Sequence, residues 1–168
     1  MIETERKYII QAVPDSILQS FEGYKKIAIS QTYLQSTDGL TRRVRKSVFS
    51  DGSIEYMYNQ KKRVSDISCI EDEKRITKAE YALFLDQKEP HTCTVEKIRR
   101  VFVFKGQTFE VDSYAFSNEL CVCETELESE EMRAEFPQEI TIVREVSGDK
   151  HFSNHSIAKL LFQGENIF

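Results

Sequence analysis

Hydrophobic and polar residues alternate along most of the chain, in short runs separated by glycine-containing dipeptides. Alternation with a period of two is typical of β-strands that bury one face. Asp38-Gly39, Asp51-Gly52 and Lys105-Gly106 each separate two such runs, and glycine tolerates the positive φ that a tight hairpin turn needs. The pattern predicts eight strands, joined mostly as antiparallel hairpins, over residues 2–10, 30–36, 40–48, 54–63, 69–76, 94–104, 107–115 and 120–128.

Helix signals stand in the segments between and after these strands. Thr77 and Glu80 match a capping box, which begins a helix. Gly23 and Pro137 follow apolar-periodic segments that they are expected to end. Asn154 is a suitable N-cap for a last helix. The predicted helices therefore cover residues 14–21, 77–85, 130–136 and the segment that follows residue 154.

Eight antiparallel strands with few helices predict a mainly β, α+β fold. Closing such a sheet into a barrel removes its exposed edges. We expect a closed eight-stranded antiparallel barrel with helices packed outside. The chain has 168 residues and 40% hydrophobic content, which is enough for one domain with its own core. Residues 1–168 are thus predicted to form a single domain.

The composition narrows the class of protein. A net charge of −5 argues against a nucleic-acid partner, because nucleic-acid affinity comes largely from positive charge. The four cysteines form no C-x-x-C pair and no zinc-site spacing. With no secretory leader, we expect them to stay reduced in the cytoplasm. Apolar runs such as residues 81–85 are too short for a membrane span, so no membrane partner is expected. The sequence leaves open whether the protein forms a homodimer.

The polar faces of the predicted strands are charged. Seven of the eight strands carry two like charges at i and i+2, which places both on one face. At this composition, about one strand of typical length in four should carry such a pair by chance. The opposite faces can pack under helices, which leaves the charges on the inner wall. The pairs are Glu3/Glu5, Arg43/Arg45, Lys61/Arg63, Glu71/Glu73, Lys97/Arg99, Glu110/Asp112 and Glu124/Glu126.

A barrel lined by charges needs water and a ligand inside, because an unpaired buried ion costs several kcal/mol. The basic strands favour a polyanion, and the clustered carboxylates favour a hard divalent cation such as Mg²⁺ or Mn²⁺. A polyphosphate with bound metal satisfies both. On this interpretation Glu3 and Glu5 hold metal and Lys7 contacts phosphate. Taken alone, the opening stretch also fits a solvated outer face.

In these motifs the chain resembles the CYTH domains, or triphosphate tunnel metalloenzymes. The signature of that family is an N-terminal E-x-E-x-K, which stands here at residues 3–7. Seven further segments resemble the family in the same order, which makes the resemblance more specific than one motif. They are Q-T-Y-L at 31–34, R-V-R at 43–45, E-D-E followed by Ile76 at 71–76, V-E-K-I-R at 95–99, F-E-V-D at 109–112, E-T-E-L at 124–127, and E-V-S-G-D at 145–149 with Ser153 and Asn154.

The resemblance implies a tunnel that binds a small-molecule triphosphate with Mg²⁺ or Mn²⁺. The implied reaction is hydrolysis of a terminal phosphoanhydride, with inorganic triphosphate favoured. A bound metal neutralises developing charge and lowers the pKa of water, so no Ser or Cys nucleophile is needed. The implied metal ligands are Glu3, Glu5, Glu124 and Glu126. The implied phosphate ligands are Lys7, Arg43, Arg45, Lys61, Lys97 and Arg99. Glu71, Glu73 and Asp112 are expected to hold a second metal or orient water, and Glu5 and Lys7 join them as catalytic residues.

The chain departs from the family pattern at three places, which affects substrate preference more than fold. Cys69 stands where the family often has an arginine, and His151 stands where an arginine is common, beside Lys150. Asn59-Gln60-Lys61 replaces a usual T-x-K, so the pattern leaves open whether Lys61 or Lys62 points inward.

Three other functions fit parts of the pattern. A class IV adenylate cyclase has the same tunnel but tends to carry an acidic residue and paired aromatics after the second-strand glutamine; residues 31–34 resemble the triphosphatase form. Animal thiamine triphosphatases use a tryptophan, and this chain has none. A non-catalytic polyphosphate-binding module needs only the basic strands, so the acidic strands favour the hydrolase.

Overall fold

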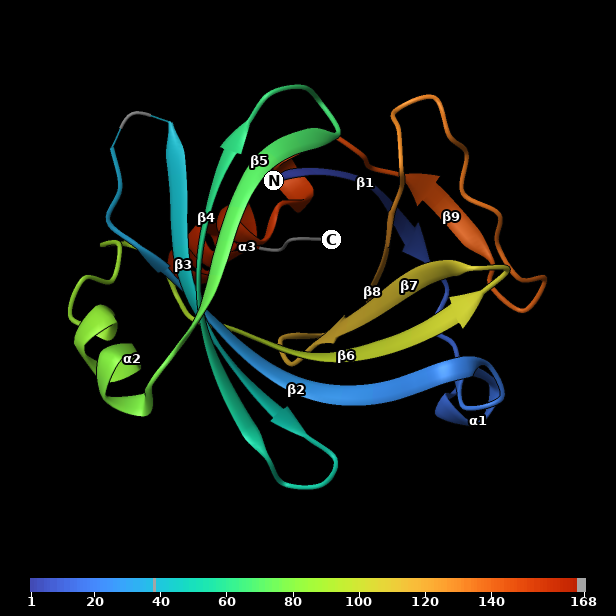
Figure 1. Cartoon of the computed structure of the whole chain (residues 1–168), viewed down its shortest axis with the longest axis horizontal. Helices are drawn as coiled ribbons and strands as arrows, with labels where there is room; N and C mark the ends of the chain where they lie inside the picture. Colours follow the sequence, from blue (N-terminus) through green and yellow to red (C-terminus); the bar gives the residue numbers. More distant parts are fainter. Residues whose placement is uncertain (38, 166–168) are drawn as a thin grey trace.

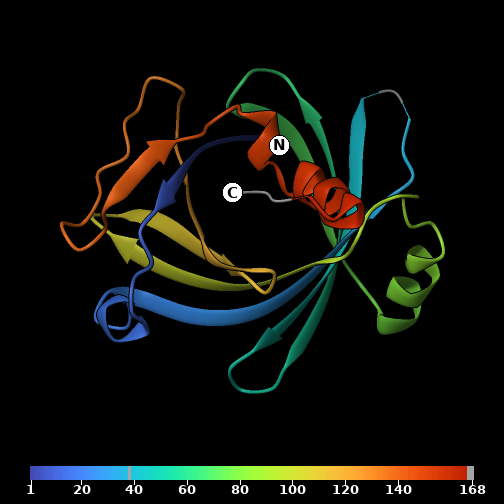
Figure 2. The same cartoon turned by 180° about the vertical axis from the view of Figure 1, so that it is seen from behind.

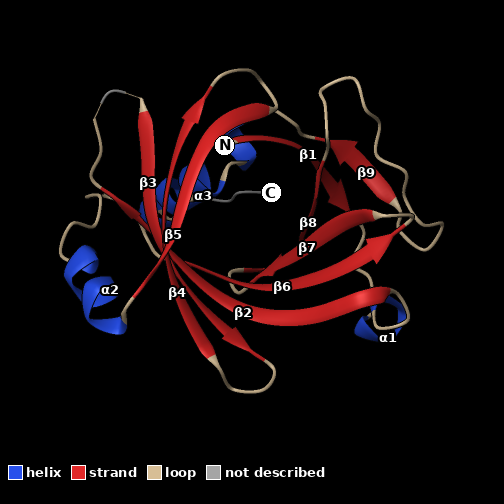
Figure 3. Cartoon of the chain, viewed as in Figure 1, coloured by secondary structure: helices blue, strands red, loops and turns tan. Residues whose placement is uncertain are grey.

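Strands dominate the structure, a computed structural model that describes residues 1–37 and 39–165 (Figure 3). Each strand pairs antiparallel with its neighbours in the order β5-β4-β3-β2-β6-β7-β8-β1. Their bounds are β1 (Ile2–Ile10), β2 (Glu22–Leu34), β3 (Leu40–Phe49), β4 (Ile54–Arg63), β5 (Ser68–Ile76), β6 (Val95–Phe104), β7 (Gln107–Tyr114) and β8 (Ser117–Glu126).

The sheet closes into the predicted eight-stranded barrel because β1 pairs with β8 through part of its length and with β5 at its start (Figure 1). In this register Glu3 lies opposite Cys69, and Glu5 lies opposite Glu126. A ninth strand, β9 (Ile142–Glu145), pairs with the end of β1 and was not predicted. Its residues are all exposed, so no alternation of buried and exposed positions marks it in the sequence.

Among the described residues, two helices lie outside the barrel wall as predicted, but the last one packs into one end of the barrel, where Ile157 and Ala158 share an apolar cluster with inward-facing residues such as Ile9 and Val122. The helices are α1 (Asp15–Leu18), α2 (Lys78–Leu85) and α3 (Asn154–Gln163), with a short 3₁₀ helix, η1 (Lys150–Phe152). Figure 2 shows α3 across the opening of the barrel, with α1 and α2 at opposite sides of the molecule.

The capping box of Thr77 and Glu80 begins α2 as predicted. In α3 the N-cap is Ser153, one residue before the predicted one, and its hydroxyl accepts from the Ser156 amide. No helix in the described ranges is long and apolar enough to cross a membrane.

The predicted helix over residues 130–136 is wrong. This segment is irregular, because its side chains are engaged by separate partners rather than by each other. The ring of Phe136 packs against Tyr8 and Phe109, and the Glu135 amide donates to the Gln107 side chain. Tertiary contacts along an extended path therefore replace the helix.

Two other boundaries differ from the prediction. The first helix covers only residues 15–18 of the predicted 14–21, and β2 begins at residue 22 rather than 30. Gly23 was expected to end the helix, but it lies inside β2 at φ 67°, where the register with β6 is irregular. A glycine that permits positive φ is needed equally at a helix end and at a β-bulge, so the sequence signal was ambiguous.

The hairpin turns follow the prediction. Lys105 and Gly106, at φ 49° and 75°, form a two-residue turn between β6 and β7, as a type I′ hairpin requires. Gly52 has φ 85° in the turn between β3 and β4. Of the Asp38-Gly39 turn, Asp38 lies outside the described residues, and Gly39 has φ 71°.

Two parts of the apolar core lie between the outer wall and the covering segments, and a third part fills the end of the barrel beneath α3. Val44 and Ile76 pack under α2, whereas Ile157 and Ala158 of α3 pack against β6 and its neighbours. Phe109, Val111, Cys121 and Cys123, which alternate with the acidic pairs of β7 and β8, are buried in a further apolar cluster around α1 and residues 134–140. The charged faces of these strands consequently turn toward the inside of the barrel.

Candidate active site

The barrel encloses a polar cavity of about 1150 Å³. Because side chains alternate along each strand, the like-charged pairs share its inner wall. All but two of the predicted site residues line this cavity. Those that line it are Glu3, Glu5, Lys7, Arg43, Arg45, Lys61, Glu71, Glu73, Arg99, Glu124 and Glu126.

Lys61, rather than Lys62, points into the cavity. Its Nζ lies 2.7 Å from Oε2 of Glu3 and 3.9 Å from Oε2 of Glu71. Lys62 is exposed and does not line the cavity. The strand pairing that sets Lys61 beside Glu71 decides this point, which the departure from T-x-K had left open.

Three arginines form the cationic part of the wall. Arg43 and Arg45 come from β3 and Arg99 from β6, and each of the first two is close enough to Arg99 for mutual repulsion. Burial, followed by the charge of Arg43, lowers the pKa of Arg45. The nearest carboxylate oxygen to Arg45, on Glu73, is 3.6 Å away, and the buried Nε of Arg45 has no hydrogen-bond partner. Arg45 is therefore poorly neutralised by the protein itself.

Carboxylates crowd the part of the wall formed by β1 and β8. Glu5 and Glu124 share a hydrogen bond, and Nζ of Lys7 lies 3.3 Å from Oε1 of Glu124. Burial, and then the charge of Glu124, raises the pKa of Glu5 well above its ordinary value. Burial also acts to raise the pKa of Glu124, but the charges of Lys7, Arg99 and Lys97 outweigh it and lower that pKa. Glu5 therefore retains a proton more readily than Glu124 does.

The donor set of this acidic wall fits a hard divalent cation, because it offers carboxylate oxygens and no soft ligand apart from the Cys69 thiol. Glu5 and Glu124 lie close enough to repel each other when both are ionised, and a bound cation would relieve that repulsion. Within residues 1–37 and 39–165 no three His, Cys, Asp or Glu side chains are grouped closely enough to form a complete metal site. The carboxylates are instead drawn toward neighbouring lysines, such as Glu3 toward Lys61.

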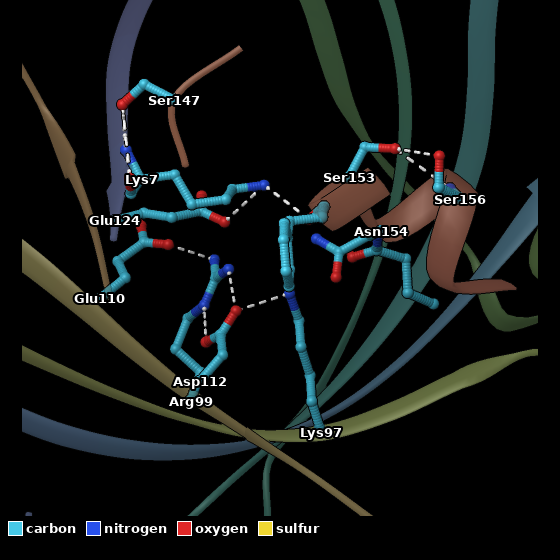
Figure 4. Close-up of polar contacts among 12 residues, drawn as sticks. Lys7, Lys97, Arg99, Glu110, Asp112, Glu124, Ser147, Ser153, Asn154 and Ser156 are labelled. Carbon is cyan, nitrogen blue, oxygen red and sulfur yellow. Dashed lines mark hydrogen bonds and ion pairs between the residues drawn. The ribbon is translucent and has the colours of Figure 1, made fainter. Parts of the chain in front are cut away.

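Lys97 and Asp112, the two remaining predicted residues, lie in the wall rather than on the cavity surface. Both side chains are 1% exposed, and Nζ of Lys97 donates to Oδ2 of Asp112 at 2.7 Å. Arg99 donates to both oxygens of Asp112, from Nε at 2.8 Å and NH2 at 2.9 Å (Figure 4). Burial lowers the pKa of Lys97 to about 8 against the attraction of Asp112. Burial would raise the pKa of Asp112, but Arg99 and Lys97 outweigh it and lower that pKa.

Several cavity residues are absent from the predicted site. Glu110 lines the cavity and forms an ion pair with Arg99. The like-charge pair of Glu110 and Asp112 was recognised in the sequence, but Glu110 was assigned no role. The segment leading into α3 contributes Lys150, Ser153 and His155. The only signal for this part of the wall in the sequence was the family-like E-V-S-G-D stretch with Ser153 and Asn154.

The positions that depart from the family pattern lie differently in the structure. Cys69 lines the cavity, with Sγ 3.4 Å from Oε2 of Glu3, and burial raises the pKa of its thiol to about 11. His151 is exposed and does not line the cavity, whereas the adjacent Lys150 does. Cys69 therefore brings no positive charge to the place where the family often has an arginine.

Known proteins similar to this chain share both sequence and fold. The inorganic triphosphatase of Acetivibrio thermocellus is 32% identical over 163 residues, covering 94% of this chain and 93% of that protein. The solved structure of the inorganic triphosphatase NE1496 is 27% identical, with a TM-score of 0.58 and coverage of 94% of each chain. A putative adenylate cyclase from Bacillus halodurans, 19% identical with a TM-score of 0.52, covers 77% of this chain and 82% of its own and shares the fold.

No protein-family model matches the chain. The similarity to the Acetivibrio protein nevertheless extends over almost the whole of both sequences, and the barrel carries the E-x-E-x-K motif on its inner wall. The chain belongs to the CYTH-domain, or triphosphate tunnel metalloenzyme, family.

Proposed function

We propose that this protein hydrolyses the terminal phosphoanhydride of inorganic triphosphate, with Mg²⁺ or Mn²⁺ as its cofactor. The observation that carries the proposal is the group of Arg43, Arg45 and Arg99 around one cavity, with a buried Nε of Arg45 that has no partner. Guanidinium groups that the protein leaves under-neutralised favour a polyanion. The relative named inorganic triphosphatase supports this choice of anion.

The basic side chains bind and orient the substrate. Arg45 and Arg43 are assigned to phosphate oxygens because they face the cavity with few carboxylate contacts. Lys7 and Lys61 stand between carboxylates and the cavity, so each exchanges a carboxylate for a phosphate oxygen when substrate enters. Lys97, which is buried against Asp112, acts through Arg99 rather than by contact.

The cation ligands are assigned to the acidic wall. Glu5 and Glu124 are in contact and desolvated, and Glu3 and Glu126 line the same cavity. A divalent cation held there would neutralise charge on the phosphoanhydride and lower the pKa of water. Without a cation, Lys7 and Lys61 offset the repulsion between these carboxylates.

Glu71 and Glu73 are assigned to the attacking water. Both accept hydrogen bonds from Nδ2 of Asn59, which fixes their position on the wall. The oxygen of water forms a bond to the terminal phosphorus while the bridging P–O bond breaks, and a carboxylate accepts the proton of water. The products are phosphate and pyrophosphate. Holding a second cation is the other role open to Glu71, Glu73 and the buried Asp112.

One experiment tests the function. The purified protein is incubated with Mg²⁺ or Mn²⁺ and, in parallel, with inorganic triphosphate, ATP and pyrophosphate. We expect phosphate release to be fastest from inorganic triphosphate and to stop when the metal is chelated. Formation of cyclic AMP would establish a cyclase instead, and tight binding of triphosphate without turnover would establish a binding module.

A further inference from the structure

Two carboxylates of β7 stand two residues apart but lie in different environments. The side chain of Asp112 is 1% exposed, whereas that of Glu110 is 36% exposed and lines the cavity. Figure 4 shows Arg99 between them, with Asp112 at one edge of the guanidinium and Glu110 at another. Asp112 is thus the buried partner of Arg99, and Glu110 is its accessible partner.

The contacts of Arg99 differ in strength. Asp112 accepts from Nε and NH2 of Arg99 with both oxygens, and Lys97 donates to Oδ2 of the same carboxylate. This arrangement is buried and bidentate, so it fixes the guanidinium in place. Glu110 contacts only NH1 through an ion pair. A single contact from an accessible side chain is the one that an incoming anion can replace.

Glu110 is also held in an unfavourable place. Its backbone partner on β8 is Glu124, and like charges directly opposite each other on neighbouring strands repel. Glu124 has Lys7 and Glu5 as partners of its own. The attraction to Arg99 is therefore what keeps the Glu110 carboxylate against the wall, and it competes with that repulsion.

We propose that Glu110 is a displaceable counter-ion that occupies the phosphate-binding edge of Arg99 in the ligand-free protein. An incoming anion must break the ion pair between Glu110 and Arg99, so Glu110 lowers the apparent affinity of the cavity for anions. A triphosphate, which also reaches Arg43 and Arg45, gains enough contacts to displace Glu110. A single phosphate, the product, gains fewer and is released. This counter-ion role rests on the proposed function, because it takes the cavity to be the triphosphate site.

The test is a set of calorimetric titrations without metal, using inorganic triphosphate and inorganic phosphate as probes. We expect Glu110→Gln to bind each anion about fivefold more tightly than the unaltered protein, because an ion pair worth about 1 kcal/mol no longer has to be broken. Glu110→Ala should show the same gain. Asp66→Asn is the matched control: Asp66 also lines the cavity, its side chain has no ion pair with Arg99, and its loss should change affinity less than about twofold. Melting temperatures verify that each variant is folded.

The outcomes separate this inference from the function beneath it. Tighter binding by both Glu110 variants, with Asp66→Asn unchanged, supports the counter-ion. Unchanged or weaker binding by Glu110→Gln overturns it and leaves the triphosphatase proposal standing. An equal gain in Asp66→Asn also overturns it, since the effect would then be one of general charge. If the unaltered protein binds no triphosphate, the proposed function fails, and the inference falls with it.

Discussion

Replacing Asp112 by asparagine should destabilise the protein strongly even without any ligand. Asp112 accepts three charge-assisted hydrogen bonds, at 2.7, 2.8 and 2.9 Å, from Lys97 and Arg99. Their side chains are 1% and 12% exposed, so water cannot replace the lost carboxylate. Removing one partner of a buried ion pair costs about 3–5 kcal/mol. At about 2–4 °C per kcal/mol for a chain of this size, the melting temperature should fall by roughly 6–20 °C.

The measurement is urea unfolding at neutral pH together with thermal melting, both in the presence of a chelator. Glu110→Gln is the matched comparison, because it removes a carboxylate two residues away on the same strand. With one ion pair on a 36% exposed side chain, it should cost no more than about 1 kcal/mol. Losses of equal size in the two variants, or a loss below about 1 kcal/mol in Asp112→Asn, would show that the buried network does not stabilise the barrel.

Three further predictions concern binding and pH. Arg45→Ala should weaken triphosphate binding with or without metal, whereas Glu5→Gln should abolish turnover and keep metal-free binding; equal increases in KM with unchanged kcat would refute this division of roles. A non-hydrolysable triphosphate should stabilise the fold by about 2.7 kcal/mol at a hundredfold excess over Kd, and an equal rise in melting temperature with a monophosphate would indicate general anion binding. The hydrogen bond from Lys26 and the pairing with Arg100 lower the pKa of Asp15 below 3.8. Its contribution is therefore present above that pH and lost as pH falls through the folded pKa. Asp15→Asn should cost about 1 kcal/mol at pH 7, with a difference that shrinks toward pH 3 in urea titrations; a constant difference would contradict the ion pairing.

Many of the charged side chains around the cavity form ion pairs with one another. Lys61 contacts Glu3, Lys7 contacts Glu124, and Arg99 contacts two carboxylates. Such pairs reduce the cost of desolvating like charges in the ligand-free barrel. Arg43 and Arg45 are less neutralised: Arg43 has no ion pair within 4.0 Å among the described residues, and the nearest carboxylate oxygen to Arg45 is at 3.6 Å. Anion binding is consequently expected to depend directly on both arginines, and Arg45 also has a buried Nε without a hydrogen-bond partner.

The amino-acid sequence by itself determined the eight barrel strands apart from the start of β2, the hairpins that join them, and the face on which each charge lies. Alternation has a period of two, and apolar side chains such as Phe109 and Val111 must leave water. Glu110 and Asp112, which alternate with them, were thereby turned inward. The glycine turns needed no tertiary information, because positive φ at Gly52 and Gly106 is a local requirement.

Only the tertiary structure decided how deep each inward side chain lies and what it contacts. The stagger of the closed barrel buries Lys97 and Asp112 and leaves Glu110 at the cavity, although all three are inward positions of equal standing in the sequence pattern. The same holds for β9 and for residues 130–136, whose conformations come from partners far along the chain. The burial of a side chain and the residues that it contacts depend on long-range packing, and local periodicity carries no information about that packing.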